Sequence, residues 1–115
     1  MWYLILSRRQ PDIPHAKMVI HEHFKWMQAR HAAGDVLFSG PKPDRTMGIY
    51  VIQAASVAAA TAIADSDPLH VSGQRTYELI EWEVHQVLGV GPFSVAGVHA
   101  LAQTGAAPHY TKIPS

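Results

Sequence analysis

Residues 2–7 read Trp-Tyr-Leu-Ile-Leu-Ser, an almost unbroken run of aromatic and aliphatic side chains. Such residues favour extended structure, so the stretch is predicted to be a first strand. Its apolar side chains fall on both faces of the strand: Trp2, Leu4 and Leu6 on one, Tyr3 and Ile5 on the other. Helices can cover one face of the sheet, and the other face needs a second sheet or the end of the chain.

The other elements follow from this strand and from breaks at glycine and proline. We predict a helix over 15–33 ended by Gly34, a strand over 36–39, a turn over 40–44, a strand over 46–53, a helix over 57–65 capped by Ser56, and an alternating strand over 75–87. The order β-α-β-β-α-β predicts an α+β, ferredoxin-like fold. Both helices would lie on one face of the sheet, and a second subunit is the economical cover for the other.

The length of 115 residues predicts one folded domain. We place this α+β domain at residues 1–88. Residues 89–115 are rich in glycine, proline and apolar side chains, and are predicted to be a C-terminal extension that packs on the domain or on a partner subunit. A loosely ordered end is an equally good interpretation from Gly105 onward.

Composition narrows the class of protein. Nine Lys and Arg balance nine Asp and Glu, so the net charge is zero, which argues against a nucleic-acid binder. The absence of cysteine excludes disulfides, thiolate metal sites and cysteine nucleophiles. No apolar run reaches the ~18 residues that a membrane helix needs. The amino-terminal apolar run precedes a basic pair, the reverse of a secretory signal, so a cytoplasmic location is predicted. Low surface charge favours a homodimer or higher homo-oligomer.

Two residues are candidates for proton chemistry. His23 lies on or beside the apolar stripe of the first helix, and histidine is the side chain best suited to proton transfer near neutral pH. Asp67 follows the second helix, where a carboxylate opposes the negative end of the helix dipole at ~0.3–1 kcal/mol. That misfit indicates a role such as orienting a histidine. Considered singly, a hydrogen-bonded structural histidine and a turn aspartate are the commoner interpretations.

Further residues are candidates for substrate binding. Arg8 and Arg9 follow the first strand and could hold a carboxylate or phenolate, although a solvated strand end is the commoner role. Ser39 is a candidate hydrogen-bond donor, and His70 could reach a pocket. No phosphate loop or dinucleotide fingerprint occurs, so no cofactor is predicted.

The eight histidines do not form a local metal site. His21 and His23 would point about 200° apart on a helix. His23 and His31 are too far apart along the helix axis to chelate one ion directly. No metal site is therefore predicted, and a metal-dependent enzyme assembled from distant segments stays open as an alternative.

The sequence resembles the YCII-related family over about residues 1–88. The resemblance lies in the strand at 2–7, His23, the stretch Leu37-Phe38-Ser39-Gly40-Pro41, the pair Asp67-Pro68, and a last strand that contains Trp82. It implies a dimeric ferredoxin-like α+β barrel whose His and Asp form the proposed active-site dyad. Those roles would fall on His23 and Asp67. The family is similar to muconolactone-isomerase-like proteins and includes dehydrochlorinases of chlorinated, hydroxylated aromatics. Ile20 departs from its pattern, because an arginine is common there.

We therefore expect a small cofactor-independent acid–base enzyme, a lyase (dehydrochlorinase) or isomerase. Its substrate would be a small cyclic or hydroxylated aromatic compound, and no nucleic acid or membrane partner is expected. The alternative is a non-catalytic module for small-ligand binding or dimerisation, in which His23 and Asp67 only satisfy each other.

Overall fold

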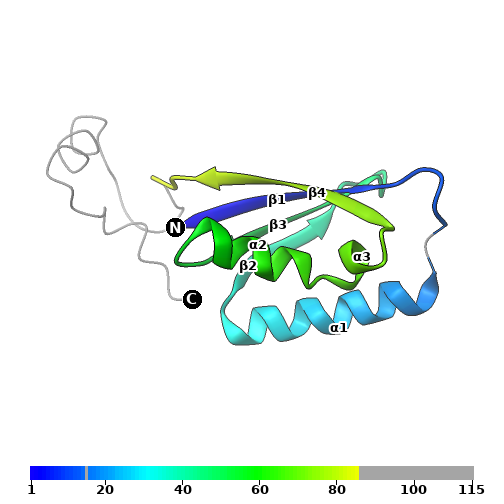
Figure 1. Cartoon of the computed structure of the whole chain (residues 1–115), viewed down its shortest axis with the longest axis horizontal. Coiled ribbons are helices and arrows are strands. Elements are labelled where there is room, and N and C mark those ends of the chain that lie inside the picture. The colour runs from blue at the N-terminus through cyan, green and yellow to red at the C-terminus, as the bar shows by residue number, and fades with distance from the viewer. Residues whose placement is uncertain (15, 86–115) are drawn as a thin grey trace, which may run out of the picture. The chain divides into compact units, whose positions relative to one another are not determined.

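The computed structural model describes residues 1–14 and 16–85. Their elements, in chain order, are β1 (Trp2–Arg9), α1 (Lys17–Ala33), β2 (Val36–Pro41), β3 (Met47–Gln53), α2 (Val57–Asp65), α3 (Pro68–Val71) and β4 (Arg75–Trp82), labelled in Figure 1. The strands form one antiparallel sheet in the order β2-β3-β1-β4. The predicted ferredoxin-like α+β fold is confirmed.

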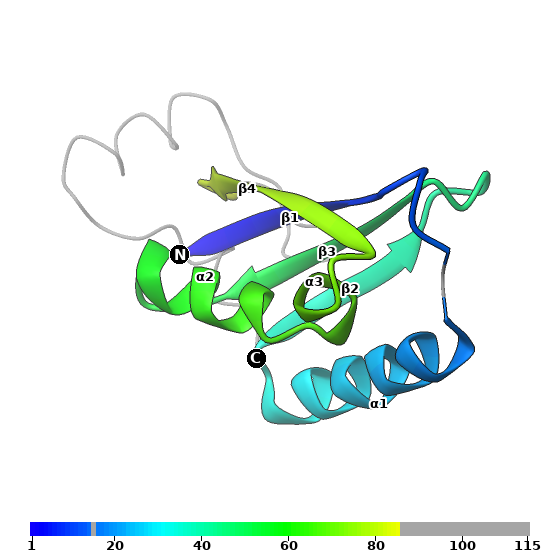
Figure 2. The same ribbon diagram turned by 45° about the vertical axis from the view of Figure 1, so that its right-hand side comes forward.

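The helices cover one face of the sheet, as Figures 1 and 2 both show. The core lies between them and is built from alternate strand residues, because successive side chains of a strand point to opposite faces. Tyr3 and Ile5 of β1 are buried there beside their cross-strand partners Ile52 and Tyr50 of β3. Ala60 and Ala64 bring α2 close to the sheet, because their small side chains allow a short separation.

The ladder between β1 and β4 explains where the last strand ends. The sequence predicts a strand from residue 75 to residue 87, but β4 ends at Trp82. Trp82 pairs with Trp2, the first residue of β1, so β4 has no further partner on that strand. At the other end, Arg9 pairs with Arg75, which carries β1 two residues beyond the prediction.

The apolar stripe predicted for the first helix is only partly buried. Met27 packs in the core, whereas Met18 is 75% exposed and Phe24 is 64% exposed. Phe24 lines a cavity between α1 and the strands, so no strand side chain packs fully against it. Gly34 ends the helix in the left-handed conformation, as predicted.

The predicted extension, residues 89–115, lies outside the described residues, and the domain limits of 1–88 stay a prediction. Among the helices that the structure describes, none is long and apolar enough to cross a membrane.

Candidate active site

A cavity of about 390 Å³ lies between α1 and the sheet; we refer to it as the helix–sheet cavity. Its lining includes Ile20, His23 and Phe24 of α1, Ser7 of β1, Tyr50 of β3 and Arg75 of β4. Residues of β2, α3 and the turn between β2 and β3 complete it. Concave sites of this size, mostly apolar with a few polar groups, are typical of small-molecule binding.

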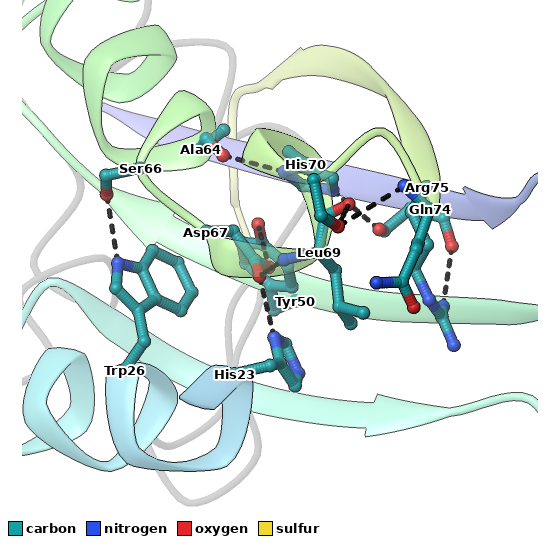
Figure 3. A network of polar contacts seen from close by, with 12 residues as sticks. His23, Trp26, Tyr50, Ala64, Ser66, Asp67, Leu69, His70, Gln74 and Arg75 are labelled. Atoms are coloured by element: carbon teal, nitrogen blue, oxygen red, sulfur yellow. Dashed lines mark hydrogen bonds and ion pairs between the residues drawn. The ribbon is translucent and has the colours of Figure 1, made fainter. Parts of the chain in front are cut away.

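His23 lines this cavity and contacts Asp67, which lies outside the lining and 44 positions away in the chain. The distance from His23 Nδ1 to Asp67 Oδ1 is 2.8 Å, and the contact is visible in Figure 3. The Asp67 side chain is fully buried, whereas that of His23 keeps 17% of its surface exposed. Because a carboxylate only accepts hydrogen bonds, Nδ1 carries the proton, and in neutral His23 the unprotonated atom is Nε2. Among residues 1–14 and 16–85, no hydrogen bond engages Nε2.

Asp67 owes its position to α3. It is the N-cap of this short helix, with Pro68 in the first turn, and its Oδ1 accepts a 2.9 Å hydrogen bond from the Leu69 N–H. The dipole argument made from the sequence therefore needs correction: Asp67 lies at the favourable amino end of the next helix. That argument did not predict that a second helix follows α2 directly and begins at Asp67-Pro68.

Three donors surround the Asp67 carboxylate. Besides His23 and Leu69, the Tyr50 hydroxyl donates to Oδ2 at 3.2 Å. Burial alone would raise the pKa of Asp67, but the hydrogen bond and charge of His23, the Leu69 N–H and the charge of His70 outweigh it and leave this pKa below its usual value. Asp67 is therefore a carboxylate held ready to face a protonated imidazole.

Tyr50 was not singled out from the sequence. Burial, followed by the Asp67 charge, raises the pKa of its phenol, so Tyr50 stays a neutral donor. Its ring packs edge-on against Trp26, whose indole N–H donates to Ser66 Oγ at 2.9 Å. The alternation of the strand could have indicated that Tyr50 faces the helices, because it puts Tyr50 on the same face as the core residue Ile52.

His70 reaches the cavity through Ser7. Its Nδ1 lies 2.6 Å from the Ala64 carbonyl and its Nε2 lies 2.6 Å from Ser7 Oγ. A carbonyl only accepts, so Nδ1–H donates, and in the neutral ring Nε2 accepts from the Ser7 hydroxyl. Burial lowers the pKa of His70, which favours that neutral ring. Ser7 is 2% exposed and lines the cavity, whereas His70 does not.

Ser39 shows a similar arrangement on the edge strand β2. It lines the cavity, and its Oγ lies 2.8 Å from Nε2 of His31. Nδ1 of His31 donates to the Val36 carbonyl at 2.9 Å. With a neutral His31, the Ser39 hydroxyl donates to the ring and leaves its oxygen as an acceptor.

The arginines that line the cavity are not the two that the sequence predicted to bind the substrate. Arg8 is exposed, with its guanidinium 3.8 Å from Glu78, and neither Arg8 nor Arg9 is part of the lining. Arg45 and Arg75 line the cavity instead. Arg75 has the same strand parity as Tyr77 and Leu79, so alternation places it on the helix-covered face. No sequence signal singles out Arg45, a turn residue.

The histidines do not converge on a metal site within the described part of the chain. No group of three or more His, Asp or Glu side chains is placed to hold an ion there. His23, His31 and His70 each contact a different protein group instead, and His21 is exposed.

These features define a ferredoxin-like α+β domain that places a histidine–carboxylate pair at a small cavity. The model of the YCII-related domain matches residues 1–83, and the chain belongs to this family. The protein YjpA of Bacillus subtilis (strain 168) is 34% identical over 82 residues, which are 71% of this chain and 94% of YjpA. The predicted family is therefore confirmed.

A solved structure shares the fold. The 5-chloro-2-hydroxyhydroquinone dehydrochlorinase TftG of Burkholderia phenoliruptrix AC1100, in complex with 2,5-dihydroxybenzoquinone, superposes with a TM-score of 0.58. The match covers 72% of this chain and 94% of TftG at 16% sequence identity.

Proposed function

We propose that this chain is a small, cofactor-independent acid–base enzyme in which His23 and Asp67 form the catalytic dyad. The observation that carries the proposal is the 2.8 Å hydrogen bond between His23 Nδ1 and the buried Asp67 carboxylate, at the wall of a cavity. This bond orients the imidazole and leaves Nε2 as the atom that exchanges a proton with the substrate. Asp67 then stabilises the imidazolium that forms.

The reaction would be an elimination or an isomerisation on a small cyclic or hydroxylated aromatic compound. In the elimination, His23 Nε2 takes a proton from the substrate, a new π bond forms, and chloride leaves with the electrons of the carbon–chlorine bond. In the isomerisation, the same proton returns to a different carbon. Support for the first reaction comes from TftG, which has this fold and whose name describes a dehydrochlorinase.

The residues predicted to bind the substrate differ in how directly they could contact it. Ser39 lines the cavity and can contact a substrate hydroxyl directly. His70 would act through Ser7, whose hydroxyl it holds. Contacts from Arg8 and Arg9 stay predictions.

The test is turnover of a panel of chlorinated hydroxyhydroquinones and lactones, followed by released chloride and by ultraviolet absorbance. His23→Gln should lower kcat by ~10²–10⁴-fold, the usual contribution of a general acid or base. Asp67→Asn should also lower kcat. Its Oδ1 can still accept from Leu69 and His23, so this variant removes the charge and keeps the cap.

His21→Gln is the matched control, because His21 is an exposed histidine on the same helix and is absent from the cavity lining. It should turn over like the wild type. Full turnover by His23→Gln would refute the dyad. A panel of compounds that bind and return unchanged would favour the non-catalytic binding module.

A further inference from the structure

We propose that Arg75 forms an anion subsite in the helix–sheet cavity, so that the ligand of this protein is a small ring with a carboxylate or phenolate group. The proposal deepens the proposed function, since it concerns the same cavity. Its test measures binding and does not depend on turnover.

Arg75 is a partly buried cation without an ion pair among residues 1–14 and 16–85. Its Nη1 donates to the Ser7 carbonyl at 3.0 Å, and its buried Nε has no hydrogen-bond partner. Burial of a charge is costly unless the charge is paired, so a ligand anion would supply what the described protein groups do not. Figure 3 shows the guanidinium beside Gln74, on the β4 side of the network.

The charges around Arg75 are of both signs: burial lowers the pKa of its guanidinium, the Asp67 carboxylate raises it, and the charge of Arg9 lowers it. Arg45 also lines the cavity, and the described lining contains no Asp or Glu. Arg9 is the cross-strand partner of Arg75, and like charges in that position destabilise a sheet unless something compensates them. Arg45 and Arg75 therefore bring two positive charges to the lining, and no described carboxylate of the lining offsets them. An anion bound beside Arg75 in the cavity would offset its charge and lessen the repulsion from Arg9.

Gly48 makes the position of the guanidinium possible. A Cβ at residue 48 would lie 3.1 Å from Arg75 Nη1 and 4.0 Å from Ser7 Cβ. The first distance is closer than ordinary van der Waals contact, so a side chain there would push the guanidinium away by a few tenths of an ångström. Gly48 is thus a positioning residue for the anion contact.

Calorimetric titration with benzoate and benzamide tests the subsite, because the two rings have nearly the same shape and differ in charge. The wild type should bind benzoate more tightly. Arg75→Gln should weaken benzoate binding by about tenfold or more, the loss of a charge-assisted hydrogen bond, and leave benzamide binding nearly unchanged. Gly48→Ala should weaken benzoate binding less, because it moves the charge without removing it.

Two other variants sharpen the result. Lys25→Gln removes one exposed positive charge outside the cavity lining and should leave both affinities unchanged. Arg8→Gln tests the competing position at the end of β1. The proposal is overturned if Arg8→Gln loses the benzoate preference and Arg75→Gln keeps it. It is also overturned if the wild type does not prefer benzoate to benzamide at millimolar concentration.

Binding and catalysis can fail separately. Benzoate should bind to His23→Gln much as it binds to the wild type, because the anion contact belongs to Arg75. If Arg75→Gln weakens benzoate binding and the wild type turns over no substrate, only the catalytic proposal is wrong. If turnover depends on His23 while Arg75→Gln binds benzoate normally, only the subsite is wrong.

Discussion

Asp67 has two roles that depend on one another. Its Oδ1 caps α3 through the Leu69 N–H and also accepts from His23. The backbone of α3 thereby holds the carboxylate in place for the imidazole. The same short helix carries His70, which ties it to β1 through Ser7. Both ionisable groups have pKa values shifted downward, so both make the stability of the fold depend on pH.

We predict that the free energy of unfolding decreases in two steps as the pH falls. The unfolded chain protonates His70 near its ordinary pKa of 6.5, whereas burial lowers that pKa in the folded chain. Just below pH 6.5 the unfolded state therefore binds more protons, and acid favours it. The same sign holds for Asp67 below its ordinary pKa of 3.8.

Urea unfolding across this pH range measures both steps. His70→Asn, which can still donate to the Ala64 carbonyl, should remove the step below pH 6.5. Asp67→Asn should reduce the step below pH 3.8, to which Asp44 also contributes because hydrogen bonds from Thr46 lower its pKa. Parallel stability curves for the wild type and His70→Asn would contradict the first assignment.

At the scale of the elements, the site depends on how α3 begins and ends. Asp67 and Pro68 begin the helix, and Gly73 leads out of it into β4 with a φ of 77°. This φ lies in the left-handed region, which residues other than glycine adopt at a cost. Gly73 thereby turns the chain so that Arg75 starts β4 opposite Arg9.

Gly73→Ala should lower the free energy of unfolding by about 1 kcal/mol, because the new Cβ meets no atom within 4 Å and only the backbone is strained. Gly40→Ala is the matched control, since Gly40 also has open space around it and no positive φ. That variant should stay within about 0.5 kcal/mol of the wild type. Thermal or urea unfolding measures both, and equal effects would contradict the role of φ.

At the scale of the whole molecule, the helices cover one face of the sheet, and the opposite face carries apolar side chains. Ile80 and Trp82 of β4 point to this face and are 39% and 44% exposed. Leu4 and Leu6 of β1 share this face through the alternation of the strand, as does Trp2, which is already buried at 8% exposed. A second subunit would bury the exposed surface of Ile80 and Trp82, as the apolar first strand already indicated.

We predict a homodimer that is paired through this face. Light scattering coupled to size-exclusion chromatography should give twice the chain mass of 12.6 kDa. Trp82→Glu should shift the protein toward the monomer, because it places a charge in the apolar contact. A monomeric mass for the wild type at every concentration would contradict the prediction.

The sequence alone determined the family and, apart from the short helix α3 and the end of β4, the elements and their order. The signals that predict the elements act over a few residues: strand alternation, the Ser56 cap and the break at Gly34. They can therefore be recognised from the sequence without the structure. The pairing of His23 with Asp67 was reached through a family resemblance, because no local rule links residues 44 positions apart.

Only the tertiary structure decided which charges face the cavity. Arg8 and Arg75 are both strand arginines, yet only Arg75 is part of the cavity lining, on the helix-covered face, in the space that Gly48 leaves open. That choice depends on the register between β1 and β4 and on the close approach of β3. Tyr50 donates to Asp67 for the same reason, because the packing of α3 against the sheet brings the two groups together. Helices and strands form from interactions between residues close in the sequence. The site forms from contacts between elements that are far apart in the sequence.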